Sequence, residues 1–384
     1  MKNFIPYGRQ NINEEDKKAV LSVLDSDFLT QGPKVSEFEE RLCEYTGAKY
    51  CVAVANGTAA LHLAVLSLDL QDGSEGMTTP NTFSASANCM RYNNMDVRFA
   101  DIDNKTYNIS IEGIKKNFTD NTRLIIPVHF AGQPCDMAGI HEIASERGIK
   151  IIEDASHAIG GRYSNNKRIG SCCYSDLTTF SFHPVKTMTT GEGGAITTNN
   201  PELYHRLILL RSHGITKVPE ELSNNTGPWY YEMKMLGFNY RLTDIQAALG
   251  ISQLNRLDDF VEHRRQLVKK YNDAFEEIPW LTVPFERPEV YSAFHLYVIG
   301  IDYRKIGKSR SEVMKLLSDD NIGTQVHYIP VYRLPYYEDL YHFDPEAFAN
   351  TEKYYASCLS IPLYPSMSEK QQQYVIKKII ALNS

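Results

Sequence analysis

The sequence predicts an α/β protein in which a mostly parallel sheet lies between helices and a smaller α/β unit follows. Between Tyr50 and Gly214, short apolar or β-branched runs alternate with helical stretches, a pattern typical of a parallel sheet covered on both faces. The chain has 384 residues, more than one hydrophobic core usually holds. We therefore predict a large domain over residues 1–250 and a small C-terminal domain over residues 251–384.

Composition excludes several classes of protein. The chain is 42% hydrophobic and 23% charged, as in folded globular proteins, and its net charge of -7 disfavours a nucleic-acid partner. Residues 1–20 lack the apolar run of a signal peptide, and no run is long enough to span a bilayer. We expect a cytoplasmic protein without membrane contact. The seven cysteines have no paired spacing, so neither a metal site nor disulfides are expected.

The first 48 residues predict two short helices. Asn13 caps the first, and a capping box at Ser36–Glu39 begins the second, which Gly47 ends. The composition of Leu29–Pro33 between them is typical of a turn.

Seven short runs are predicted as the strands of the large sheet, with three helices as part of its covering layer. The strands are Tyr50–Ala55, Gly76–Thr79, Val97–Asp101, Leu124–His129, Ile149–Asp154, Leu177–Phe182 and Ala195–Thr198. The helices are Ala59–Leu68, Ser84–Tyr92 and Met137–Arg147. No GxGxxG motif follows any of these strands, which disfavours a nicotinamide-binding domain.

The C-terminal part alternates again. Residues 218–231 lack periodicity and are predicted as a loop of the kind that forms an interface or a lid. A capping box at Thr243–Gln246, followed by helical spacing from Leu254 to Phe275, predicts one long helix that leads out of the large domain. The remaining strands are predicted at Leu296–Ile301, Gln325–Ile329 and Leu359–Pro362, with helices that begin at Ser309 and Ser368.

Lys186 lies on the loop between two of the predicted strands. A lysine on a loop is usually a solvated side chain. Here, however, glycines that allow close approach of the backbone surround it, together with hydroxyl groups suited to a bound phosphate or ring. These neighbours are Ser181, Thr187, Thr189, Thr190, Gly191, Gly193 and Gly194. A lysine in such surroundings is a candidate for Schiff-base chemistry.

Schiff-base chemistry with pyridoxal phosphate (PLP) also requires an acid at the pyridine nitrogen and a phosphate cradle. The strand Ile149–Asp154 ends in two carboxylates, Glu153 and Asp154, at the edge where α/β proteins bind ligands. Asn56, Gly57 and Thr58 stand between a strand and a helix, where free backbone N–H groups attract phosphate. A strand-terminal Asp often only caps a helix, and capping is also the commoner use of an Asn-Gly-Thr turn.

With these motifs the chain resembles the DegT-type nucleotide-sugar aminotransferases, PLP enzymes of fold type I. The resemblance extends nearly from end to end. It is carried by FLTQGPKVSEFEE (28–40), NGTAALHLA (56–64), TTPNTFSASAN (78–88), EDASHAIGG (153–161), SFHPVKTMTTGEGGA (181–195), LRSHGI (210–215), GFNYRLTDIQAALG (237–250) and QVHYIPVY (325–332).

The resemblance implies roles at individual positions. Lys186 would carry the Schiff base, Asp154 would pair with the pyridine nitrogen, and His157 would lie by the phenolic oxygen. Phe83 would stack on the ring, and Leu29–Pro33 would belong to the rim of the site. The remaining cofactor contacts would be Gly57, Thr58 and Ser181 at the phosphate, and Asn239 at the phosphate of the neighbouring subunit. A homodimer with shared active sites is therefore implied.

The runs around Lys186, Gly214 and Asn239 resemble the branch of the family that acts in pseudaminic acid biosynthesis. That resemblance implies transfer of an amino group from L-glutamate to C4 of a UDP-linked 4-keto-6-deoxy-N-acetylhexosamine. Many members of this branch have a serine- and alanine-containing turn where this chain has Asn56-Gly57-Thr58, so the sugar stays open. Alternatives are a 4-aminotransferase for a bacillosamine- or perosamine-type sugar, and a catalytically idle sugar-binding or regulatory protein. Relatives that are dehydratases carry histidine where this chain has Lys186.

His327 and Tyr328 are predicted on or just past a strand of the small domain. Two interpretations stay open for His327, a hydrogen-bonded structural histidine and a contact with the substrate.

Overall fold

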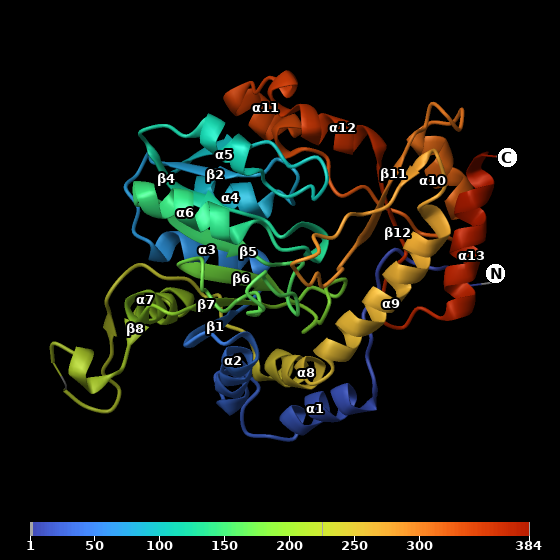
Figure 1. Ribbon diagram of the computed structural model, residues 1–384. Coiled ribbons are helices and arrows are strands. Elements are labelled where there is room, and N and C mark those ends of the chain that lie inside the picture. The colour runs from blue at the N-terminus through green and yellow to red at the C-terminus, as the bar shows by residue number, and fades with distance from the viewer. Residues whose placement is uncertain (1–2, 225, 384) are drawn as a thin grey trace.

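A seven-stranded sheet forms the centre of the larger part of the molecule (Figure 1). The computed structural model describes residues 3–224 and 226–383. The strands of this sheet are β1 (Tyr50–Val54), β2 (Glu75–Thr78), β3 (Asp96–Phe99), β4 (Thr122–Ile126), β5 (Lys150–Asp154), β6 (Leu177–Ser181) and β7 (Gly194–Thr198). They lie in the order β1-β7-β6-β5-β4-β2-β3. Only β7 pairs antiparallel, with β1 and β6, so the prediction of a mostly parallel sheet is confirmed.

The seven predicted strands all form, with shifted ends. The largest shift is at β4, which was predicted to reach His129 and ends at Ile126. Pro127 follows at once, and because proline has no N–H it cannot continue the pattern of donors that a central strand needs.

Helices cover both faces of the sheet (Figure 1). One face packs on α3 (Gly57–Ser67), α4 (Ala85–Tyr92) and α7 (Pro201–Arg211). The other packs on α2 (Pro33–Thr46), α5 (Ile111–Asn117), α6 (Met137–Arg147) and α8 (Asp244–Leu254). An additional helix, α1 (Glu14–Leu24), packs against α8. Adjacent residues Ile151 and Ile152 of β5 belong to opposite cores, as the alternation of side chains along a strand requires.

The predicted capping box at Ser36–Glu39 is wrong. Helix α2 begins at Pro33, so Ser36 lies inside it, and its N-cap Gly32 has no side chain to offer. The carboxylate of Asp244 instead accepts hydrogen bonds from the N–H groups of Gly32 (2.8 Å) and Lys34 (2.9 Å). A distant residue therefore supplies the acceptors that a local serine was predicted to supply. The N-cap at Asn13 and the helix end at Gly47 are confirmed.

The prediction of a single long helix after Thr243 is also wrong. The capping box of Thr243 with Gln246 forms as predicted, but α8 ends at Leu254 and a second helix, α9 (Leu257–Phe275), leaves it at an angle (Figure 1). Arg256 between them has non-helical backbone angles, and its guanidinium bonds Asp16 and Asn11 near the start of the chain. The domain boundary at residue 250 falls within α8 and stays a prediction.

A three-stranded antiparallel sheet organises the smaller part. It consists of β10 (Leu281–Thr282), β11 (Tyr297–Ile301) and β12 (Cys358–Ile361). Helices α9, α10 (Arg310–Asp319) and α13 (Glu369–Ile380) pack against it. The helices predicted to begin at Ser309 and Ser368 form, and each of these serines is the N-cap of a capping box. The predicted strand Gln325–Ile329 does not form. Gln325 alone pairs with Ser360, because the chain then leaves the sheet and Pro330 follows.

The chain next returns to the large sheet before it completes the small one. This returning segment comprises η3 (Val331–Arg333), α11 (Pro335–Tyr341), η4 (Pro345–Phe348) and α12 (Ala349–Ser357). The Val331 N–H donates to the Pro80 carbonyl at 3.0 Å, and the Tyr337 hydroxyl donates to Asn88 Oδ1 at 2.8 Å. The part of this segment from Val331 to Tyr337 is thus docked on α4 and the residues before it, although the sequence predicted it in the small domain.

An arm projects from the large part after α7 (Figure 1). It carries the short pair β8 (Ile215–Thr216) and β9 (Glu232–Met233) and the turn η2 (Pro219–Glu221). Residues 218–231 are irregular apart from that turn, as predicted; residue 225 lies outside the described residues. Among the described helices, none is long and apolar enough to cross a membrane. All seven cysteines are free thiols.

Candidate active site

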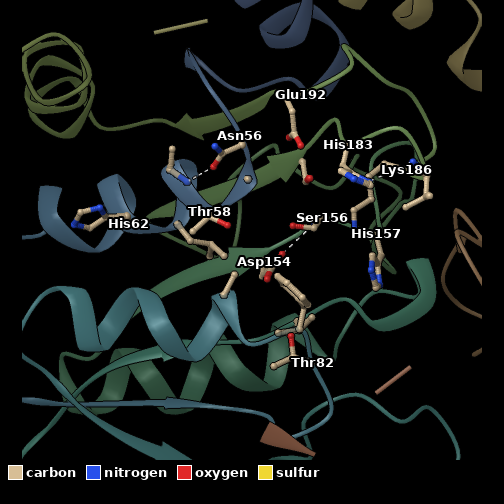
Figure 2. A pocket seen from close by; sticks show the side chains of 18 of the residues that line it. Asn56, Thr58, His62, Thr82, Asp154, Ser156, His157, His183, Lys186 and Glu192 are labelled. Carbon is tan, nitrogen blue, oxygen red and sulfur yellow. Dashed lines mark hydrogen bonds between the residues drawn. The ribbon is translucent and has the colours of Figure 1, made fainter. Parts of the chain in front are cut away.

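A cavity with a volume of about 970 Å³ lies at the carboxyl ends of β4, β5 and β6. Its wall combines the first residues of α3, the loops that follow β5 and β6, and His327 and Tyr328 from the chain beyond the small sheet. Figure 2 shows Lys186, His157 and His183 on one side of it and Asn56, Thr58 and His62 on the other. Parallel strands bring their carboxyl ends to one edge, which is where ligands bind in such sheets.

Lys186 lies in the turn after β6, as predicted from its position between two strands. The turn is closed by a hydrogen bond from the Lys186 N–H to the His183 carbonyl at 2.9 Å. The side chain lines the cavity. Burial lowers the pKa of Lys186 to about 8, against the opposing effect of the negative charge on Asp154. A sizeable fraction of this amine is therefore neutral near pH 7, as a nucleophile or proton acceptor must be.

Asp154 ends β5 and is buried at the floor of the cavity. Its Oδ1 accepts the Ser156 N–H at 3.0 Å, and its Oδ2 accepts the Ser86 hydroxyl at 2.7 Å. The Ser86 Oγ also lies 2.8 Å from the Thr82 Oγ1. Because Ser86 has one proton and gives it to Asp154, Thr82 donates to Ser86. The sequence analysis missed Ser86; its only signal was its place in the TTPNTFSASAN motif.

His157 follows β5 and contacts Tyr328, which comes from the chain beyond the small sheet. Its Nε2 lies 3.1 Å from the hydroxyl of Tyr328, and its Nδ1 is buried without a hydrogen-bond partner. Burial, and then the charge of Lys186, hold the pKa of His157 well below its ordinary value. His157 is therefore an uncharged ring with one polar atom that no described protein group satisfies.

Four further histidines line the cavity, and two of them, His295 and His327, lie close to His157 or to the small sheet. His295, which sequence reasoning missed, lies with its ring centroid 4.5 Å from that of His157, and burial holds its pKa well below the ordinary value. The Nδ1 of His327 lies 2.7 Å from Ser360 Oγ, and burial lowers the pKa of His327 to about 4. His327 is therefore a hydrogen-bonded structural histidine that also lines the cavity, and its contact with the substrate stays a prediction.

The start of α3 forms the far wall. Asn56 caps the helix by accepting the Ala59 N–H at 2.8 Å. The N–H groups of Gly57 and Thr58 occupy the first two positions of the helix and have no acceptor within it. A Cβ at Gly57 would lie 2.8 Å from the Cβ of Ser181, so only glycine lets β6 and α3 approach this closely. These backbone N–H groups, with the hydroxyls of Thr58 and Ser181, form a candidate anion site.

The remaining two predicted residues occupy different places. Phe83 lines the cavity and is 61% exposed, with its ring centroid 6.4 Å from that of Tyr328. Asn239 is exposed and does not line the cavity of its own chain, although Phe238 and Tyr240 on either side of it do. The structure thus brings together seven of the eight predicted residues and leaves Asn239 outside.

The residues present fit PLP. The anion site at α3 suits its phosphate, Asp154 suits its ring nitrogen, and Lys186 suits its aldehyde. The buried, unpartnered Nδ1 of His157 supplies a polar atom for a ring substituent. Among the described residues no cluster of His, Cys, Asp or Glu could hold a metal ion.

Known proteins are similar to this sequence over almost its whole length. The profile of the DegT/DnrJ/EryC1/StrS aminotransferase family matches residues 10–380. The spore coat polysaccharide biosynthesis protein SpsC of Bacillus subtilis is 40% identical over 98% of this chain and 96% of its own. The UDP-4-amino-4,6-dideoxy-N-acetyl-beta-L-altrosamine transaminase of Campylobacter jejuni is 38% identical over 97% of this chain and 95% of its own.

Solved structures share the fold. PseC of Helicobacter pylori, an aminotransferase involved in the biosynthesis of pseudoaminic acid, superposes with a TM-score of 0.91 at 31% identity and covers 99% of each chain. The PLP form of Spr1654 of Streptococcus pneumoniae, a putative sugar aminotransferase, superposes with a TM-score of 0.90 at 27% identity over 99% of this chain and 98% of its own. With the cavity, its lysine and its anion site, these likenesses show that the chain belongs to the DegT/DnrJ/EryC1/StrS aminotransferase family, as a PLP-dependent nucleotide-sugar aminotransferase.

Proposed function

We propose that the enzyme transfers the amino group of L-glutamate to C4 of a UDP-linked 4-keto-6-deoxy-N-acetylhexosamine, giving UDP-4-amino-4,6-dideoxy-N-acetyl-β-L-altrosamine for pseudaminic acid biosynthesis. The observation that carries this proposal is the 38% identity, over 97% of the chain, to the Campylobacter jejuni transaminase named for that sugar. The resemblance of the fold to PseC supports it.

The residues of the cavity divide the chemistry among them. PLP, when bound, supplies an electron sink and carries the amino group between the two substrates. Lys186 removes a proton from the reacting carbon of the amino donor and returns one to C4 of the sugar, since burial keeps part of its amine neutral. Asp154 holds the proton on the ring nitrogen, and the Ser86 hydroxyl and the Ser156 N–H fix the orientation of its carboxylate.

The electrostatics of the cavity favours one place for the phosphate of the cofactor. His157, His295 and His327 all have pKa values lowered by burial, so these rings are uncharged at neutral pH. A phosphate therefore finds its favourable site at the start of α3, where the helix dipole and free N–H groups lie, rather than among the histidines. Lys186 lies across the cavity from that site in Figure 2, where its amine would bond the aldehyde of the cofactor.

We also propose a two-fold dimer in which Asn239 serves the phosphate site of the partner. Asn239 is exposed and lies outside its own cavity, so it is free to reach another chain. The arm beside it carries exposed Trp229, Tyr231, Met233 and Leu236. Large apolar side chains gathered on one exposed segment favour burial against a second subunit.

The substrate is tested by product analysis. The purified enzyme, loaded with PLP, is supplied with L-glutamate and a panel of UDP- and dTDP-linked 4-keto sugars, and each product is identified by NMR. The altrosamine product should form fastest. The second candidate product is a different 4-amino sugar, since SpsC, which is 40% identical, is named for spore coat polysaccharide biosynthesis and not for pseudaminic acid. Faster formation of a bacillosamine- or perosamine-type product would select that candidate, and no turnover with any sugar would leave the idle binding protein.

A further inference from the structure

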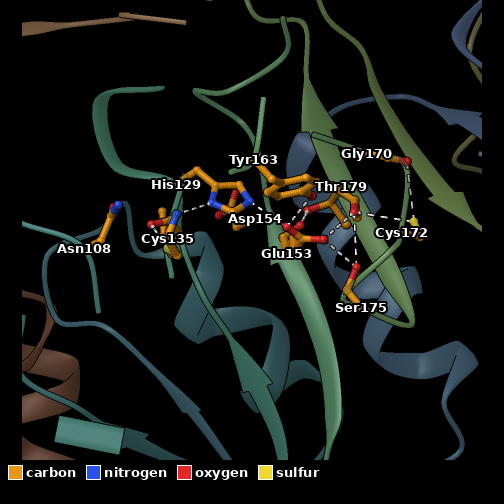
Figure 3. A network of polar contacts seen from close by, with 12 residues as sticks. Asn108, His129, Cys135, Glu153, Asp154, Tyr163, Gly170, Cys172, Ser175 and Thr179 are labelled. Carbon is orange, nitrogen blue, oxygen red and sulfur yellow. Dashed lines mark hydrogen bonds and ion pairs between the residues drawn. The ribbon is translucent and has the colours of Figure 1, made fainter. Parts of the chain in front are cut away.

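Glu153, the residue before Asp154, is a buried carboxylate that the reaction does not use. It is 0% exposed and lies on the face of β5 opposite Asp154. Four donors surround it: His129 Nε2 at 2.8 Å and the Tyr163 hydroxyl at 2.7 Å on Oε2, and the Ser175 hydroxyl at 2.5 Å and the Thr178 hydroxyl at 3.1 Å on Oε1 (Figure 3). Two donors on each oxygen occupy the accepting capacity of an ionised carboxylate.

The protonation of His129 follows from its other contact. Its Nδ1 accepts the Cys135 N–H at 3.1 Å, so its single ring proton is on Nε2 and is donated to Glu153. A second proton, on Nδ1, would point at the Cys135 N–H, and two donors cannot hydrogen-bond each other. Burial by itself would raise the pKa of Glu153, but the hydrogen bond and the electrostatic attraction of His129, with the hydrogen bonds from the Ser175 and Tyr163 hydroxyls, outweigh it and lower the pKa. In the part of the chain that is described, His129 is the one ion-pair partner of Glu153, so Glu153 is a buried anion held by hydrogen bonds.

These contacts close a ring of bonds around the end of β5. The Glu153 side chain bonds the His129 ring, and the His129 N–H donates to the Asp154 carbonyl at 3.1 Å. The Asp154 N–H donates to the Pro127 carbonyl at 2.9 Å. On the β6 side, the Thr179 hydroxyl donates to the Glu153 carbonyl at 3.1 Å. The backbone at Glu153 and Asp154 is therefore hydrogen-bonded from both the β4 side and the β6 side. The contact on the β4 side that runs through His129 depends on the Glu153 carboxylate.

We propose that Glu153 is a positioning residue that fixes Asp154 toward the ring nitrogen of PLP and places a second negative charge behind it. A pyridine ring that keeps its proton is a cation. A buried carboxylate in the low-dielectric interior acts over a longer range than a solvated one. The inference rests on the use of PLP and not on the identity of the sugar, so the product analysis and the test below can fail independently.

The test compares Glu153→Gln with Val375→Ala, a remote core truncation in α13 that lowers stability without touching β5. Glutamine keeps the shape of glutamate but presents an amide NH₂ to hydroxyl donors. For each protein we measure denaturant unfolding of the apo form, the dissociation constant of PLP, and the circular dichroism of the cofactor band per bound PLP. That band reports how the protein holds the ring.

Glu153→Gln should weaken PLP binding by about tenfold or more, the lower range for residues that orient a direct ligand of a bound group, and should reduce the band per bound PLP. Val375→Ala should lose stability with both cofactor readouts unchanged. If Glu153→Gln loses stability only, as Val375→Ala does, the positioning role is overturned. If Glu153→Gln does not fold, Tyr163→Phe and Ser175→Ala decide. Each removes one donor and keeps the charge, and an unchanged cofactor band in both would overturn the proposal.

Discussion

At the scale of single residues, the pKa of the Lys186 amine decides how much of this group is in its reactive, neutral form. The pKa of Lys186 is lowered to about 8, so about a tenth of the side chains are neutral at pH 7 and half at pH 8. A solvated lysine would be neutral only to a few parts in ten thousand at pH 7, by the same relation (about 0.03%). Burial therefore raises the supply of reactive amine by more than two orders of magnitude (roughly 10²).

The rate at which apo enzyme combines with PLP should follow this titration. Only the neutral amine attacks the aldehyde, so the rate should rise with pH and level off above a midpoint near 8. Stopped-flow absorbance of the visible cofactor band measures it, with Lys186→Ala as the control that lacks the band. A midpoint near that of a solvated lysine would show that Lys186 is not buried as described.

Replacing Lys186 with alanine should abolish turnover while PLP is still retained at the phosphate site. Proton transfer by a positioned group is typically worth about 10²- to 10⁴-fold, and the same side chain also forms the bond to the cofactor, so we expect a larger loss than that. Steady-state turnover and equilibrium dialysis of PLP measure the two effects separately. Appreciable steady-state transamination by the variant would contradict the assignment.

Asp154→Asn should be nearly as damaging. An amide cannot stabilise a protonated pyridine, so the electron sink weakens, whereas Ser86→Ala removes only one hydrogen bond to the same carboxylate and should lose much less. Comparing kcat of the two variants at saturating substrate checks the order. Wild-type turnover in Asp154→Asn would remove this carboxylate from the reaction.

The sequence predicted Lys186 and Asp154 because each stands beside a strand among residues that suit a cofactor. It did not predict Ser86, whose hydrogen bond to Asp154 joins positions 68 residues apart, nor His295, which comes into the cavity from the small part of the chain. Neither residue belongs to a local pattern. Only the packing of distant segments gives such side chains their neighbours.

At the scale of elements, the site depends on how closely α3 approaches the end of β6. Hydrophobic periodicity found both elements, because α3 is apolar on all sides and β6 is buried. Periodicity could not find the cap of α2, which Asp244 supplies across 212 residues. It also predicted a strand at Gln325–Ile329, where Gln325 alone pairs and the chain then bends, so that His327 and Tyr328 line the cavity. Apolar and aromatic residues that line a cavity share their sequence pattern with those of a buried strand.

Gly57→Ala tests that close approach. The new Cβ would lie 2.8 Å from the Cβ of Ser181, and relieving such a clash typically costs about 1–3 kcal/mol. We expect PLP to bind about tenfold more weakly or worse, since the cradle is displaced. The second substitution Ser181→Gly removes the obstructing atoms together with a hydroxyl of the anion site. Gly57→Ala should therefore weaken PLP binding much less in the Ser181→Gly background than in the wild type. If Gly57→Ala weakens binding equally in both backgrounds, crowding against Ser181 is not the cause.

At the scale of the whole molecule, sequence predicted the class of fold and the family, and the structure and comparisons confirmed both. The assembly is harder to predict, because a surface residue that contacts another subunit has its partner outside its own chain. Asn239 illustrates this, since its own chain gives it an exposed position outside the cavity. Its proposed role depends on the second subunit.

Mixing two inactive variants tests the shared site. In a heterodimer of Lys186→Ala with Asn239→Ala, one site has neither substitution only if Asn239 acts across the interface. Random exchange of equal amounts should then restore about a quarter of the wild-type activity, because half of the dimers are mixed and each has one intact site. Verified exchange with no gain over the parents, when Asn239→Ala is itself impaired, would show that each site uses one chain.

Segments far apart in the sequence close the same side of the cavity, and this affects when the cavity can form. Ile5 pairs with Ile322, and the Leu363 N–H donates to the Tyr7 carbonyl at 3.0 Å. Tyr7 and Tyr328 both line the cavity. Contacts between residues so far apart in sequence form slowly during folding. We therefore expect the large sheet, with Lys186 and Asp154, to form before the wall that contains Tyr7 and Tyr328, and cofactor binding to follow the closing of that wall.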